Sequence, residues 1–249
     1  MKLLRLLPLL CLAALPLSAA DGWVNLFNGR DLEGWEQHSG TAKYRVEEGA
    51  IVGTTVLKTG NSFLCTKRAY GDFILELEFK VARNMNSGIQ FRSEFYTQET
   101  EKEINGKKRK FPADRVFGYQ YEIDPSDRAW TGGVYDEARR GWLADLKDKP
   151  AAQKAFRQGE WNKVRIECRG DRIQTWINDV PATDFRDAMT PRGIIAASRR
   201  RFSSPLSPSA PRPGRPSTFG PVDRPGRPKR FRPRPLRPGP PIGWSRAVR

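Results

Sequence analysis

The sequence contains few histidines and cysteines and few long apolar runs. Its one histidine, His38, excludes a site built from several imidazoles and any mechanism that needs two of them. Its three cysteines are too few for a four-cysteine zinc site or a dense disulfide framework. Hydrophobic residues make up 38% of the 249 positions and aromatic residues 10%. That composition is too polar for a protein with several membrane spans and too aromatic for a wholly disordered chain.

The net charge of +16 is unevenly distributed along the chain. Residues 198–249 contain 14 basic side chains and one acidic one, whereas residues 21–197 contain 28 basic and 27 acidic ones. The central region is therefore nearly neutral, and its bulk charge gives no reason to expect nucleic-acid binding. We predict no nucleic-acid partner.

Residues 1–20 have the pattern of a secretory signal. Residues 1–5 are a basic start, residues 6–17 an apolar run, and residues 18–20 a small-residue stretch that suits a signal peptidase. The apolar run is shorter than the ~20 residues that a helix needs to cross a bilayer. The alternative is a buried N-terminal helix. We expect a periplasmic or secreted protein with no membrane anchor.

Two cysteines, Cys65 and Cys168, lie in the central region. An oxidising compartment permits a disulfide between them. Two buried free thiols are an equally consistent interpretation.

The C-terminal segment, residues 198–249, contains 13 prolines and 13 arginines and few large apolar residues. Such a composition predicts a disordered tail, because it cannot offset the entropy lost on ordering. The tail could bind polyanions, or act as a proline-rich linker or ligand. The abrupt change of composition favours a third interpretation, out-of-frame translation of a GC-rich gene.

Residues 21–197 read as one all-β domain. Alternation is clearest in residues 73–82, where the apolar side chains of Phe73, Leu75 and Leu77 share one face. Further strands are expected at 50–55, 62–67, 88–94, 116–124, 162–168, 172–178 and 193–196. A surface loop is expected at 97–113 and a short helix at 151–156. Many strands without βαβ spacing predict a two-sheet sandwich of jelly-roll type.

Two of the expected strands carry most of the polar side chains that could form a functional site. On residues 88–94 the polar face holds Gln90, Arg92 and Glu94. On residues 119–124 it holds Gln120, Glu122 and Asp124. If the apolar faces pack between the sheets, these side chains line an outer surface, and their planar groups suit a hydroxyl-rich ligand. The alternative is a solvated face with cross-strand ion pairs.

Aromatic side chains follow these strands directly. Trp130, Tyr135 and Trp142 could supply platforms for sugar rings. Glu122 and Asp124 could also form the carboxylate pair of a retaining glycosidase, which requires carboxyl groups ~5–5.5 Å apart.

Four motifs in order resemble a known family. They are residues 23–35 (WVNLFNGRDLEGW), residues 86–92 (NSGIQFR), residues 119–124 with TGGVY at 131–135, and GEWN at 159–162 with INDV at 177–180. Over residues 22–196 the chain resembles the 3-keto-disaccharide hydrolase domain family.

The resemblance implies a concanavalin A-like jelly roll acting on glycosides or oligosaccharides whose sugar carries a ketone at C3. Such a substrate can be cleaved by C2 deprotonation, elimination and hydration. In this scheme Glu122 or Asp124 is the base, Arg92 stabilises the oxyanion, and Tyr135 donates a proton. The substrate would then be bound by Gln90, Gln120, Glu94, Trp130 and Trp142. A non-catalytic carbohydrate-binding module is the alternative function.

No cofactor is firmly implied. A divalent metal ion with Glu122 and Asp124 as oxygen ligands is the alternative way to polarise the ketone. The resemblance also implies further strands after residue 196, and residues 198–249 contain no counterpart. Their loss would expose a sheet edge.

Overall fold

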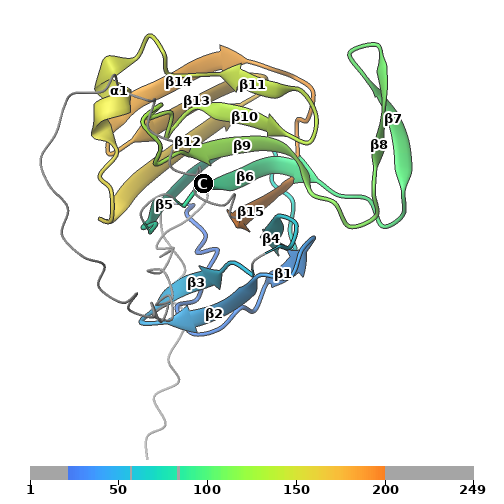
Figure 1. Ribbon diagram of the computed structural model, residues 1–249, viewed down its shortest axis with the longest axis horizontal. Helices are drawn as coiled ribbons and strands as arrows, with labels where there is room; N and C mark the ends of the chain where they lie inside the picture. The colour runs from blue at the N-terminus through green and yellow to red at the C-terminus, as the bar shows by residue number, and fades with distance from the viewer. Residues whose placement is uncertain (1–21, 57, 83–84, 200–249) are drawn as a thin grey trace, which may run out of the picture.

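The computed structural model describes residues 22–199 except residues 57, 83 and 84 (Figure 1). These residues form two packed antiparallel sheets, two separate hairpins and one short helix. The predicted signal at 1–20 and all but the first two residues of the predicted tail lie outside the described residues. The all-β sandwich expected from the sequence is confirmed.

The larger sheet has seven strands in the order β1-β4-β15-β6-β9-β10-β11. They are β1 (Trp35–His38), β4 (Ser62–Thr66), β15 (Ile194–Arg199), β6 (Ser87–Glu94), β9 (Phe117–Ile123), β10 (Val134–Glu137) and β11 (Gly141–Ala144). Strand β15 continues past the compositional break at residue 197. Ser198 is fully buried and pairs with Gly88, so it belongs to the sheet.

The smaller sheet has four strands in the order β14-β13-β12-β5. They are β14 (Val180–Arg186), β13 (Arg172–Ile177), β12 (Asn162–Arg169) and β5 (Phe73–Phe79). In β5 the alternation predicted from the sequence is seen directly. Phe73, Leu75 and Leu77 are at most 3% exposed, and Glu76 and Glu78 face outward.

The main core lies between the two sheets. The apolar face of β5 packs in one cluster with Ile89 and Phe91 of β6 and with Tyr121 of β9. Because side chains alternate along a strand, the residues between these positions point away from the smaller sheet. This is why Gln90, Gln120 and Glu122 reach the outer face of the larger sheet.

A second apolar cluster lies on that outer face and contains Phe63, Cys65, Val116, Ile194 and Ala196. Cys168 instead belongs to the core between the sheets. The two thiols are therefore on different faces and are free, which rules out the disulfide alternative in this structure. Burial raises the pKa of both thiols, that of Cys168 to about 12.

Two hairpins complete the β structure. Strands β2 (Lys43–Glu47) and β3 (Ala50–Thr54) form one, and β7 (Thr100–Ile104) and β8 (Lys107–Phe111) form the other. Figure 1 shows the β7–β8 hairpin standing away from the sandwich. The surface loop expected at 97–113 is thus wrong. Asn105 and Gly106 both have positive φ, as a tight hairpin turn requires, and this Asn-Gly pair was the missed signal.

The expected helix is confirmed as α1 (Pro150–Ala155). It is six residues long. Within the described ranges no helix has the length and apolar run that crossing a membrane requires.

Candidate functional site

The candidate site lies on the outer face of the larger sheet, where four strands bring polar and aromatic side chains into one row. Gln90 of β6 pairs with Gln120 of β9, and Gln120 pairs with Tyr135 of β10. Tyr135 pairs in turn with Trp142 of β11. Residues directly opposite on neighbouring strands project to the same face. The row therefore joins four residues that were selected separately from the sequence.

Glu122 is the carboxylate beside this row. Its side chain is 1% exposed. The amide nitrogen of Asn86 donates to its Oε1 at 2.7 Å, and that of Gln120 donates to its Oε2 at 2.6 Å. These two amide donors fix the position of the buried Glu122 carboxylate.

A chain of hydrogen bonds leads to Glu122 from the far end of β6. The hydroxyl of Ser93 donates to Oε1 of Gln90 at 2.8 Å, and Nε2 of Gln90 donates to Oε1 of Gln120 at 2.7 Å. Both glutamines are fully buried. Their amides hold each other and Glu122, so the expectation that they face substrate hydroxyls is corrected: they position the carboxylate.

Two glycines flank Glu122: Gly88 on β6, and Gly133 directly before β10. A Cβ on Gly88 would lie 2.5 Å from Cδ of Gln120, and one on Gly133 would lie 3.0 Å from the ring of Trp142. Gly88 pairs with Glu122 across the ladder, and the backbone N–H of Glu122 donates to the Gly133 carbonyl. The missing side chains leave the space that Gln120 and Trp142 occupy.

Replacing Gly88 with alanine is expected to displace Gln120 and weaken its bond to Glu122. The crowding should cost about 1–3 kcal/mol of stability, as overpacked cores do. Urea unfolding measures this loss. A Cβ on Gly60 would meet no atom within 4 Å, so Gly60→Ala is the matched control and should leave the midpoint unchanged. Equal midpoints for the two variants would contradict the crowding.

Asp124 lies just past the end of β9 and serves a turn. Its Oδ1 accepts from the Ser126 hydroxyl at 2.6 Å, and its Oδ2 accepts from Nε of Arg128 at 2.7 Å. Burial acts to raise the pKa of this carboxyl, but the hydrogen bonds from Ser126 and Arg128 outweigh it and the pKa is lowered. Asp124 is therefore a poorer base than its position suggested, and it holds Arg128.

Arg128 joins the aromatic residues into one cluster. Its guanidinium lies 4.7 Å from the ring centre of Trp130 and 5.0 Å from that of Trp142. The two indoles meet edge to face at 4.8 Å, and Tyr135 meets Trp142 at 5.4 Å. Arg128 was not predicted from the sequence. The sequence feature that could have indicated it is the spacing of Asp124 and Arg128, four residues apart directly after the strand.

Arg92 does not join the site. A bulge after Phe91 gives Arg92 a φ of 43° and reverses the alternation expected for this strand. Its guanidinium, 1% exposed, donates to the carbonyls of Gly71 and Gly170 and to Asp72. It therefore fastens the turns at one end of the sandwich, and its predicted role as oxyanion stabiliser is wrong.

Glu94 is also separate from Glu122. It is exposed at the end of β6, whereas Glu122 pairs with Gly88 at the other end of that strand. At ~3.4 Å per residue the two positions are about 20 Å apart. A contact of Glu94 with the same small ligand is excluded.

His38 lies on the same face but is distant from Glu122. Its Nδ1 is 2.5 Å from Oδ1 of Asp114, and its ring stacks on Phe95 at 3.8 Å. Four strand spacings separate it from Glu122, or about 19 Å. His38 joins β1 to the segment that follows β8.

The alternative of a metal held by Glu122 and Asp124 does not fit the donors around them. Both oxygens of each carboxylate accept hydrogen bonds from amide, hydroxyl or guanidinium groups. Among the residues that the structure describes, no group of three or more histidine, cysteine and acidic side chains could hold a metal ion.

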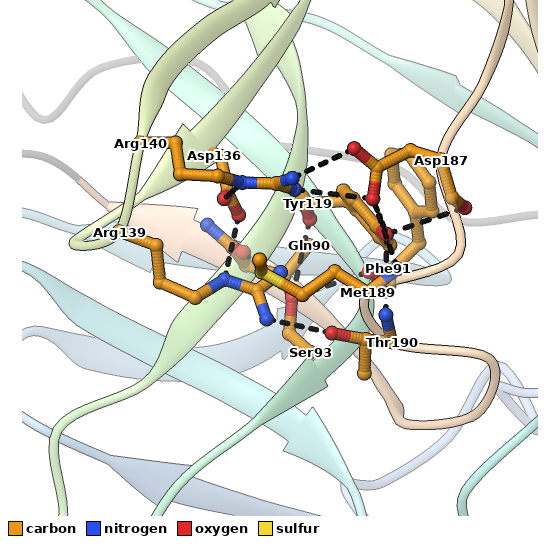
Figure 2. Close-up of polar contacts among 10 residues, drawn as sticks. All are labelled: Gln90, Phe91, Ser93, Tyr119, Asp136, Arg139, Arg140, Asp187, Met189 and Thr190. Carbon is orange, nitrogen blue, oxygen red and sulfur yellow. Dashed lines mark hydrogen bonds and ion pairs between the residues drawn. The ribbon is translucent and has the colours of Figure 1, made fainter. Parts of the chain in front are cut away.

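A second buried polar cluster lies at the other end of β9 and β10 (Figure 2). Asp136 accepts from Nε of Arg139 at 2.8 Å and from Nε of Arg140 at 2.5 Å. Arg140 also pairs with Asp187, which accepts the Tyr119 hydroxyl. Its two arginines and two aspartates balance in charge, so the cluster is structural: it ties the turn after β10 to the segment after β14.

The pKa values of this cluster reflect its burial and its pairing. Burial acts to raise the pKa of Asp187, but hydrogen bonds from Arg140 and Tyr119 lower it overall. Burial, and then the hydrogen bond to Asp187, raise the pKa of Tyr119 to about 12. Both groups therefore keep their ordinary charge states at neutral pH.

Comparison with known proteins points to one carbohydrate-related family. The family model of the 3-keto-alpha-glucoside-1,2-lyase-like domain matches residues 22–207. A 3-keto-disaccharide hydrolase of Bacteroides thetaiotaomicron is 28% identical over 157 residues, which cover 59% of this chain and 52% of the relative. The match thus spans about half the length of that relative.

Solved structures with a similar sandwich include two from Bacillus subtilis. The carbohydrate-binding module CBM66 has a TM-score of 0.47 at 17% identity, covering 67% of this chain and 88% of the module. A protein of unknown function with a galectin-like fold has a TM-score of 0.49 at 10% identity, covering 68% of this chain and 84% of that one.

Proposed function

Because this chain belongs to the 3-keto-alpha-glucoside-1,2-lyase-like domain family, we propose that it cleaves the glycosidic bond of 3-keto-glycosides with Glu122 as the base. The observation that carries the proposal is the Glu122 carboxylate, held by two amide donors beside Tyr135 and Trp142. Residues 1–20 support a periplasmic or secreted location for this activity.

The chemistry requires only a positioned base, a proton donor and a positive charge near the ketone. Glu122 removes the C2 proton, and the C–H electron pair moves toward the C3 oxygen as an enolate. The enolate then expels the C1 oxygen substituent, forming a C1–C2 double bond. The leaving oxygen takes a proton from Tyr135. Water adds at C1 and returns a proton to Tyr135, while Glu122, after exchanging its proton with solvent, returns one to C2, so the net reaction is hydrolysis.

Arg128 takes the electrostatic role that Arg92 cannot fill. Its Nε is held by Asp124, its face packs on Trp130 and Trp142, and its side chain is 43% exposed. A fixed cation near the developing enolate lowers the barrier, because the charge is already in place when the reaction begins. The indoles beside it supply an apolar surface for the sugar.

Glu122 is buried, so substrate reaches it only when its cover moves. Asn86, which contacts the carboxylate, is only half-buried and is therefore the side chain that substrate displaces. In its place a substrate hydroxyl donates to Oε1. The 1% exposure of Glu122 also favours a second candidate, a non-catalytic carbohydrate-binding module that uses the Arg128 cluster alone.

Turnover in D₂O tests the proposal. The folded protein is given a 3-keto-glucoside and, separately, its unoxidised parent, with enzyme-free samples as controls for spontaneous exchange. We expect aglycone release from the keto compound only, with solvent deuterium at C2 of the product. Release without deuterium would contradict elimination, release from both compounds would indicate an ordinary glycosidase, and binding without release would establish the binding module.

A further inference from the structure

The β7–β8 hairpin separates its charges onto two faces. It holds five basic and two acidic side chains between Thr100 and Phe111. The cross-strand pairs place Glu101 opposite Lys110 and Glu103 opposite Lys108 on one face, here called the paired face. The other face has Lys102 opposite Arg109, and Lys107 lies on this same face two residues before Arg109. This second face, here called the cationic face, has no acidic side chain.

Ion pairs follow this division. On the paired face, Lys108 lies 3.1 Å from Glu101, and Lys110 lies 3.9 Å from Glu99 at its base. No side chain in the described part of the chain forms an ion pair with Lys102, Lys107 or Arg109, and all three are exposed. Three like charges within about 7 Å repel each other, because strand residues two apart are ~6.8 Å apart. An anion across them removes that repulsion.

The hairpin is firmly attached at its base. Phe111, 2% exposed, meets the ring of Phe117 at 4.4 Å and that of Tyr96 at 5.8 Å. An isolated two-stranded hairpin is only marginally stable in water, so this aromatic anchor gives the arm its fixed position. The hairpin therefore stands beside the sandwich in one orientation (Figure 1), and Lys102, Lys107 and Arg109 on it are exposed.

We propose that the cationic face of Lys102, Lys107 and Arg109 binds an acidic polysaccharide chain, one that carries carboxylate groups along its length. The cations match a linear anion in charge. The aromatic side chain on this face, Phe111, is 2% exposed and so offers no surface on which a nucleic-acid base could stack, and the apolar Ile104 is half-buried. The choice of a glycan among polyanions rests on the proposed function. The hairpin gives the protein a second carbohydrate contact, separate from Glu122.

Lysine footprinting of the full-length protein tests this assignment residue by residue. The protein is acetylated under single-hit conditions with and without polygalacturonate, and modification of each lysine is measured by mass spectrometry. We expect acetylation of Lys102 and Lys107 to slow about fivefold, and that of Lys108 and Lys110 to change by less than about 1.5-fold, with protection lost near 1 M salt, where the Debye length is ~3 Å. Neutral dextran should protect none of them.

Two double variants supply the matched control. Lys107→Gln with Arg109→Gln and Lys108→Gln with Lys110→Gln each remove two positive charges from β8. Protection of Lys102 should disappear in the first and persist in the second. Equal protection of all four lysines, or equal loss of protection in both variants, would mean that the total charge of the hairpin attracts the polysaccharide, and would overturn the proposal. Stronger protection by duplex DNA of equal charge concentration would overturn the choice of a glycan.

The footprint needs no turnover, so it can fail or succeed independently of the proposed catalysis. Protection without turnover leaves the cationic face as a binding site. Turnover without protection removes this site and leaves Glu122 unaffected.

Discussion

Replacing Glu122 with glutamine is expected to lower kcat on a 3-keto-glucoside by about a thousandfold, within the ~10²–10⁴ range of general-base catalysis. The amide cannot accept the C2 proton. The fold should tolerate the change. Oδ1 of Asn86 is buried and has no hydrogen-bond partner among the described residues. Rotating the Asn86 amide lets that oxygen accept from the amide introduced by Glu122→Gln, so no donor is left facing another donor.

The matched control for this variant is Glu137→Gln. Glu137 is a second buried glutamate on the same sheet, 5% exposed, and it pairs with Arg115 at 2.6 Å. It pairs across the ladder with Gly118, four residues before Glu122 on β9, or about 14 Å away at ~3.4 Å per residue. Steady-state kinetics should find kcat within about threefold of the parent, because no proton-transfer group is lost. Equal losses in both variants, or an active Glu122→Gln protein, would reject Glu122 as the base.

Replacing Asp136 with asparagine is expected to cost about 3–5 kcal/mol of stability, because it leaves buried arginine charge without its counter-ion. Asp136 is fully buried and accepts hydrogen bonds from both Arg139 and Arg140 (Figure 2). Arg140 keeps Asp187, but Arg139, 4% exposed, loses the carboxylate bound to its Nε. The urea midpoint measures the loss.

Asp184→Asn makes the same chemical change at the surface. Asp184 accepts from Nε and Nη2 of Arg172 at 2.9 and 2.6 Å, and both side chains are exposed. Solvent and salt screen such pairs, so this variant should lose only a small fraction of what Asp136→Asn loses. If the two variants unfold at the same midpoint, the cluster in Figure 2 does not hold the turn after β10 in place.

Strand positions were predictable because apolar residues repeat at every second position. The pattern of Phe73, Leu75 and Leu77 is confirmed by alternating burial along β5. On β9 every residue is buried, and its apolar phase is confirmed because Tyr119 and Tyr121 belong to the core between the sheets. The β7–β8 hairpin was missed because most of its residues are polar and exposed on both faces, and Phe111 is buried only at its base. Its Asn105-Gly106 turn carried the signal that hydrophobicity did not.

The candidate site was predictable only in part. Tyr135 lies opposite Gln120 on the strand that carries Glu122, and Trp130 and Trp142 pack beside it, because the chain turns back directly after that strand. Their roles toward a sugar stay predictions. Arg92 was assigned to the wrong face because the prediction assumed that side chains alternate without a break along the strand. One bulge after Phe91 reverses that alternation. Arg128 was missed because it follows the strand in an irregular turn, where neither the two-residue period of a strand nor the 3.6-residue period of a helix applies.

By itself the sequence determined the family, the all-β class and the faces of the strands that have no bulge, because motifs and alternation are local properties of the chain. Only the tertiary structure decided which polar groups meet. Glu122 receives its two amide donors from Asn86, 36 positions away, and from Gln120 on its own strand. Arg92 binds turns from the other sheet. Such partnerships depend on strand order, register and bulges, which arise from packing across the whole domain rather than from any one segment.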